Sequence, residues 1–234
     1  MKVNWFKRGM LALAVVCLIF QPPALAQQTA LDQLKAQTPA LLQAAPKSLN
    51  NAQVTQTMSL KRFAKASSGG GMQTQSLPGE AKKPENAFYF LGLACVLIND
   101  PQVLAKAVDS VHGALQFLQA PQQLHDILTA AQSDPAKVQE FMNQSWQWAQ
   151  SKGQAAGVNF FAGAWTASNL FALNQQKTFK LEAAKDLGNF YAQTGPQQAV
   201  PILASLAGFS GKQLGPNDFQ QLGNAFSQLA DMLS

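Results

Sequence analysis

The stretch GVNFFAGAWTASNLFAL, residues 157–173, decides the fold. It lies in a longer window, residues 153–176, that contains no charged side chain. A run of this kind is compatible with a membrane span or with a helix buried in a protein core. Its two asparagines, its threonine and its serine disfavour a lipid-facing span, because amides and hydroxyls in hydrocarbon need hydrogen-bond partners. Its many small residues allow other helices to approach closely, so the stretch predicts the central buried helix of a bundle.

The rest of the chain beyond residue 85 is punctuated by proline. Five segments begin with a proline that follows a potential capping residue: NDP101, AP121, SDP135, GP196 and GP216. Proline suits the first position of a helix, where its missing N–H would be unpaired in any case. Apolar residues then recur every three or four positions, from Leu104 to Leu118 and from Phe219 to Leu233. We therefore predict an all-α fold, a multi-helix bundle or short helical array of about 7–8 helices.

Two of these segments resemble each other. PQQLHDILTAA (121–131) and PQQAVPILASL (196–206) share five residues at matching places, 75 positions apart. This similarity suggests two related four-helix units, residues 87–150 and 155–233. The alternative is chance similarity between helices that are rich in Gln, Ala and Leu.

The first 26 residues have the features of a secretory signal peptide. Lys2, Lys7 and Arg8 precede a short apolar run that ends at residue 20, and Ala24-Leu25-Ala26 is a small-x-small cleavage site. We expect cleavage after Ala26 and a location in the periplasm or outside a bacterial cell, with no transmembrane span after processing. A retained membrane anchor is the alternative.

Removal of this leader lowers the formal net charge from +5 to +2, and Arg62 is then the only arginine. We do not expect this protein to bind nucleic acid, because such binding needs a surface rich in basic residues. Residues 27–84 carry a net charge of +5 and include SSGGG at 67–71. We interpret them as a helical and flexible basic arm and linker ahead of an all-helical domain, residues 85–234. In this arm the candidate partner contacts are Lys61, Arg62, Phe63 and Lys65.

No pattern of residues predicts catalysis. Cys95 is alone once the leader is removed, lies in an apolar run and reads as a core residue. No known nucleophile, phosphate-loop or zinc spacing occurs, so we predict no catalytic residue, no metal site and no cofactor. His112 and His125, the only histidines, are the candidates for a metal site, which antiparallel helices could complete with nearby aspartates. Two packed or half-exposed histidines are the alternative.

Aromatic residues gather in the middle of the helical domain. Trp146 and Trp148 are two residues apart, so they cannot face the same way on one helix, and at least one of them is a candidate for partner binding. The other aromatic candidates form either core or an apolar pocket between helices. They are Phe141, Met142, Phe160, Phe161 and Trp165.

These observations predict an exported bacterial helical protein that acts by binding, as an adaptor or accessory factor for another envelope or secreted protein, without catalysis of its own. One alternative is a periplasmic carrier of a lipid or another apolar ligand. A second is an envelope hydrolase or metal enzyme that uses His112 and His125.

Overall fold

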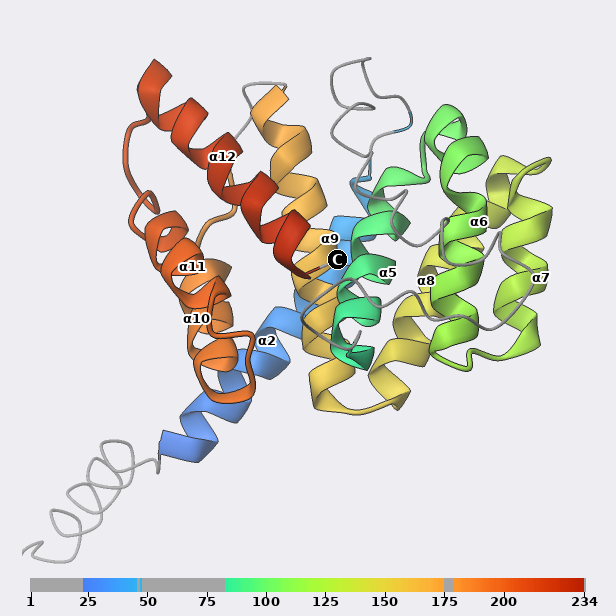
Figure 1. The fold of residues 1–234 in the computed structure, drawn as a ribbon, viewed down its shortest axis with the longest axis horizontal. Coiled ribbons are helices and arrows are strands. Elements are labelled where there is room, and N and C mark those ends of the chain that lie inside the picture. Colours follow the sequence, from blue (N-terminus) through green and yellow to red (C-terminus); the bar gives the residue numbers. More distant parts are fainter. Residues whose placement is uncertain (1–22, 46, 48–82, 175–178, 234) are drawn as a thin grey trace, which may run out of the picture. The chain divides into compact units, whose positions relative to one another are not determined.

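The computed structural model describes residues 23–45, 47, 83–174 and 179–233. Of these residues 81% are helical, in nine helices and with no strand (Figure 1), which confirms the predicted all-α class. The helices are α2 (Pro23–Gln43), α5 (Pro84–Leu97), α6 (Pro101–Phe117), α7 (Gln122–Ala131), α8 (Pro135–Ser151), α9 (Gln154–Asn174), α10 (Ala183–Thr194), α11 (Ala199–Ala207) and α12 (Pro216–Leu233).

Contacts divide the chain into two compact units, residues 1–33 and 34–234, with the boundary inside α2. The described residues of the first unit form the first part of α2, where the Gln28 side-chain amide donates a hydrogen bond of 3.3 Å to the Asp32 carboxylate. The second unit contains the remainder of α2 and all the other helices.

Three helices begin at the proline that the sequence marked. Asp100 caps α6 before Pro101, and Asp134 caps α8 before Pro135. Each carboxylate accepts a hydrogen bond from a backbone amide of the first turn, at 2.7 Å in α6 and 2.9 Å in α8. Such caps satisfy amides that have no partner inside the helix. α12 begins at Pro216.

The other two prolines lie before their helices, which corrects the prediction that they open them. Pro121 is the N-cap of α7 and has an extended conformation, with its carbonyl accepting from the Leu124 amide. Pro196 lies three residues before α11, because a turn closed by a hydrogen bond from the Ala199 amide to the Pro196 carbonyl comes first.

Helices α5 and α9 cross at two glycines. A Cβ atom added to Gly92 of α5 would lie 1.9 Å from the carbonyl oxygen of Phe160 on α9. In the same way, a Cβ added to Gly163 of α9 would lie 1.9 Å from the carbonyl oxygen of Tyr89 on α5. Each helix therefore presents a glycine to the backbone of the other, and only glycine permits this separation.

The buried polar side chains of α9 make hydrogen bonds inside the protein. Asn159, Thr166 and Asn169 each donate a hydrogen bond to the backbone carbonyl four residues earlier, at 2.8 to 2.9 Å. The side-chain oxygen of Asn169 also accepts from the Lys180 amide at 3.1 Å. Every residue from 156 to 167 is buried. These observations confirm that α9 is a central buried helix.

Helices α6 to α8 lie on one side of the α5–α9 pair, and helices α10 to α12 lie on the other (Figure 1). Counted from α5 and from α9, the fourth helices are α8 and α12, and each of these two contacts both α5 and α9. The order of helices thus agrees with two four-helix units. The duplication stays a prediction, because it also requires matching crossing angles. The equivalent glycines, Gly92 and Gly163, are 71 positions apart, whereas the sequence match elsewhere gave 75.

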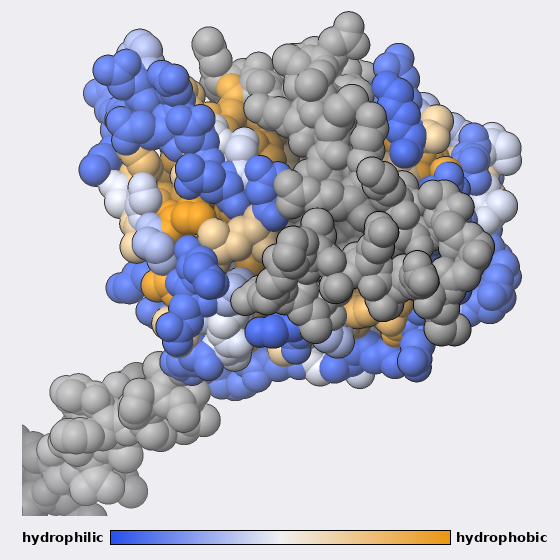
Figure 2. All heavy atoms as spheres, in the orientation of Figure 1, coloured by the Kyte–Doolittle hydropathy of each residue, from blue (hydrophilic) through white to orange (hydrophobic). Residues whose placement is uncertain are grey.

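Hydrophobic side chains reach the surface mainly in small areas between hydrophilic ones on the face that Figure 2 shows. Phe117, at the end of α6, is a large hydrophobic residue that is 44% exposed. Among the described helices, none combines the length and the apolar character that a membrane crossing requires.

Candidate functional site

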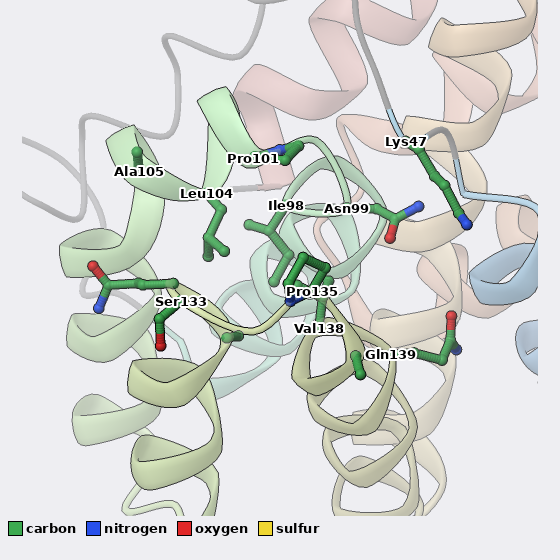
Figure 3. Close-up of a pocket in the computed structure, with 13 residues that line it drawn as sticks. Lys47, Ile98, Asn99, Pro101, Leu104, Ala105, Ser133, Pro135, Val138 and Gln139 are labelled. Carbon is green, nitrogen blue, oxygen red and sulfur yellow. The ribbon is translucent and has the colours of Figure 1, made fainter.

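A pocket of about 630 Å³ lies where four helix ends meet (Figure 3). These are the C-terminal ends of α5 and α7 and the N-terminal ends of α6 and α8. The volume falls in the range of small-molecule sites, roughly 300–1,000 Å³. The pocket is lined by Lys47, Ile98, Asn99, Pro101, Leu104, Ala105, Ala131, Gln132, Ser133, Pro135, Ala136, Val138 and Gln139.

The polar groups of this pocket lie on two sides of it. Lys47, Asn99 and Gln139 lie on one side and Ser133 lies on the other, with the side chains of Ile98 and Leu104 between them (Figure 3). The Asn99 amide donates a hydrogen bond of 2.7 Å to the Ala45 carbonyl, which fixes its orientation. Lys47 is exposed and is the one charged residue among the described lining residues. The pocket therefore suits a mainly apolar ligand that carries a hydrogen-bond acceptor beside Lys47.

The aromatic residues that were candidates for an apolar pocket are in the core. None of them lines the pocket described above, and none is more than 1% exposed: Phe141, Met142, Phe160, Phe161 and Trp165. The Trp165 ring meets the Phe226 ring of α12 at a centroid distance of 5.2 Å, and its indole N–H donates to the Lys180 carbonyl. Their burial favours the alternative that these side chains hold helices together.

The two neighbouring tryptophans have different environments. Trp146 is 5% exposed and its ring meets that of Phe160 at 5.5 Å, so a partner has little access to it. Trp148 is half-buried, with its ring against Phe88 at 5.3 Å and the Lys152 ammonium 5.7 Å from its centroid. Of the two, Trp148 offers the accessible surface that a partner contact needs.

The predicted basic contact cluster of the arm, Lys61, Arg62, Phe63 and Lys65, lies outside the described residues. So does the predicted leader up to residue 22. Both stay predictions.

The two histidines meet between α6 and α7. Their Nδ1 atoms are 3.0 Å apart, and their ring planes differ by 4°. The ring centres are 5.3 Å apart, which is about the Nδ1–Nδ1 distance plus the two ring radii. The Nδ1 atoms therefore lie on the line between the ring centres, and the parallel rings meet edge to edge. This is the geometry of a hydrogen bond between two imidazoles.

Thr129 identifies the donor in this hydrogen bond. Its hydroxyl donates to the His125 carbonyl at 2.9 Å, so towards His112 Nε2, 3.4 Å away, it can act only as an acceptor. His112 then carries its proton on Nε2, and His125 donates from Nδ1. Burial lowers the pKa of His112, the neighbouring His125 lowers it further, and Asp109 opposes both effects.

The thiol of Cys95 is fully buried in α5, where no substrate can reach it. Burial raises its pKa far above the usual range for a thiol, and a nearby Ser145 hydroxyl opposes this more weakly. The predicted role of Cys95 as a core residue is confirmed by its burial.

Sequence reasoning missed the pocket. Its lining comes from helix ends, from connecting turns and from Lys47, which is 51 positions before Ile98 in the chain. The sequence did contain one signal, the Asp-Pro pairs at residues 100–101 and 134–135. Each pair marks the start of a helix, and these two starts lie at the same end of a bundle in which successive helices run in opposite directions.

Comparison of the chain with protein-family models, with curated proteins and with solved structures gave no match.

Proposed function

We propose that the protein is an exported helical binding protein that holds a small, mainly apolar ligand in the pocket between the ends of α5 to α8. The observation that carries this proposal is the pocket itself, about 630 Å³ in volume, with apolar side chains in its middle and with the cation of Lys47 on one side. Proteins bind small molecules in concave sites of this kind, where apolar walls supply affinity and a few polar groups fix orientation. The protein acts by binding, without a reaction of its own.

Export is the part of the proposal that rests on sequence. The basic start, the short apolar run and the small residues at 24 and 26 support a cleaved leader and a place in the periplasm or outside the cell.

The pocket can be tested by filling it. Ala105 lines the pocket and is exposed, so Ala105→Trp should fill part of it without disturbing the core. Ala192 of α10 is also exposed and lies outside the pocket, so Ala192→Trp is the matched control. Calorimetric titration with decanoic acid should show binding to the wild type and to the control, and at least tenfold weaker binding to Ala105→Trp. Equal binding by all three proteins would refute the site.

The polar side has its own test. Lys47→Gln removes the charge that a carboxylate head group would meet, so it should weaken decanoic acid binding and leave decanol binding unchanged. Loss of both to the same degree would show that Lys47 does not contact the head group. Native mass spectrometry of protein purified from its own cells would then identify the natural ligand.

An adaptor role is the second candidate. The observation that favours it is Trp148, whose ring is partly accessible beside Lys152, since tryptophan is common at the centres of protein interfaces. In a pull-down from envelope extracts, deletion of residues 48–82 or the change Trp148→Ala should abolish capture of a defined partner, whereas Gln150→Ala on the same helix should not. Undiminished capture by both altered proteins would exclude the role.

A further inference from the structure

We propose that His112 and His125 together form a site for one divalent transition-metal cation of the zinc class, bound through the two Nδ1 atoms. The two nitrogens come from different helices and are 3.0 Å apart. At this separation both can lie about 2.0–2.1 Å from a single zinc ion placed beside the line that joins them. The site is separate from the pocket, because neither histidine lines it.

Two movements are needed for the cation to enter. The lone-pair directions of the two Nδ1 atoms now face each other, so each ring must turn about its Cβ–Cγ bond for them to converge on one point. Both side chains are only half-buried, which leaves room for this rotation. The proton that His125 holds on Nδ1 must also move to its Nε2, because a coordinating nitrogen needs a free lone pair.

Thr129 prepares one of the two ligands. The hydroxyl of Thr129 faces His112 Nε2 at 3.4 Å and acts there as the acceptor, because it donates to the His125 carbonyl. A metal-binding histidine usually donates its other ring N–H to an oxygen in this way, which fixes the tautomer and the ring orientation. His112 therefore already carries an unprotonated Nδ1, which is the form that a metal ligand needs.

The surroundings also favour a positive ion. Asp109, three residues before His112 on α6, is near enough to act on the pKa of that histidine, and Asp126 adjoins His125 on α7. Among the described residues no group of three or more His, Cys, Asp or Glu side chains is arranged to hold a metal. The other coordination positions would therefore be taken by water, as in an open site.

The test uses the fact that the chain has only two histidines. With ¹⁵N-labelled histidine, the imidazole NMR spectrum of the full chain shows four ring nitrogens. Titration with zinc chloride alone should shift both Nδ1 signals at a stoichiometry of one zinc per chain. His125 should change from the Nδ1–H to the Nε2–H tautomer, and His112 should keep its proton on Nε2. A response from one histidine alone, or from neither at millimolar zinc, would overturn the proposal.

Three altered proteins separate a chelate from loose surface binding. His112→Gln and His125→Gln should each weaken zinc binding at least tenfold, because one imidazole cannot chelate. Thr129→Val keeps both ligands and should weaken binding by about tenfold through loss of the orienting contact. Zinc should also raise the melting temperature of the wild type, since a ligand of the folded state stabilises it, and not that of His125→Gln. A melting temperature that zinc leaves unchanged or lowers in the wild type would likewise overturn the proposal.

Discussion

The Tyr191 hydroxyl donates a hydrogen bond of 2.7 Å to the side-chain oxygen of Asn159, and both residues are buried. This bond connects α10 to the central helix α9 at a place where water has no access. Tyr191→Phe should lower the free energy of unfolding by about 1–3 kcal/mol, because it leaves the Asn159 oxygen buried and unpaired. Urea denaturation followed by circular dichroism measures this change.

Tyr89→Phe is the control for that experiment. The Tyr89 hydroxyl is buried as well, but among the described residues it has no hydrogen-bond partner. Burial raises the pKa of Tyr89, and the nearby Thr166 hydroxyl opposes this more weakly. Removal of the Tyr89 hydroxyl should leave stability unchanged or increase it. If both changes destabilise the protein equally, the distinction between the two hydroxyls is wrong.

Gly163→Ala should be strongly destabilising, because its Cβ would overlap the Tyr89 carbonyl oxygen, which belongs to a backbone that cannot turn aside. We expect a loss of at least about 3 kcal/mol. Gly223 lies inside α12 with nothing within 4 Å of an added Cβ. Gly223→Ala should therefore stabilise the protein by roughly 0.5–1 kcal/mol through better helix formation. Thermal unfolding of the two altered proteins compares them directly, and a mild effect at Gly163 would mean that the helices do not cross so closely.

Stability should fall as the pH drops below the ordinary histidine value of about 6.5. The pKa of His112 is lowered in the folded protein, mainly by burial and then by His125, so the unfolded chain takes up the proton at a higher pH than the folded protein does. Protonation below the unfolded pKa therefore favours unfolding until the pH also passes the folded pKa, after which the loss is complete. Two protonated rings would in addition lose their hydrogen bond.

Urea midpoints at pH 7.5 and pH 5 measure this effect. His112→Gln should be less sensitive to the change than the wild type, since the remaining titrating groups are common to both proteins. An equal dependence in the two proteins would show that His112 is not the group responsible.

Cys95 should be unreactive in the folded protein, since its thiol is buried and burial raises its pKa. In a chain with Cys17→Ser, a disulfide reagent should modify no thiol under native conditions and one thiol in urea. Rapid native modification would show that α5 opens readily to solvent.

Much of the fold could be predicted from residue patterns alone. Chargeless α9 was identified as a buried helix from its small residues and scattered amides, and the Asp-Pro starts of α6 and α8 marked helix ends through backbone chemistry that is local in sequence. Contacts between segments that are distant in the sequence were harder to predict. The meeting of His112 with His125 could be foreseen only on the condition that α6 and α7 run antiparallel, and the aromatic candidates could not be divided between core and pocket without knowing which faces α5 and α12 cover.

The crossing of α5 and α9 has a consequence for how the chain folds. Gly92 and Phe160, which meet there, are 68 positions apart in the sequence, and α6, α7 and α8 lie between them. Helix α5, buried from residue 87 to residue 97, cannot cover its surface until α9 has arrived. Contacts between residues so distant in sequence slow folding. Among helices α5 to α8, the most apolar one, α5, is therefore incompletely covered until α9 has formed, and α9 is synthesised after all four of them.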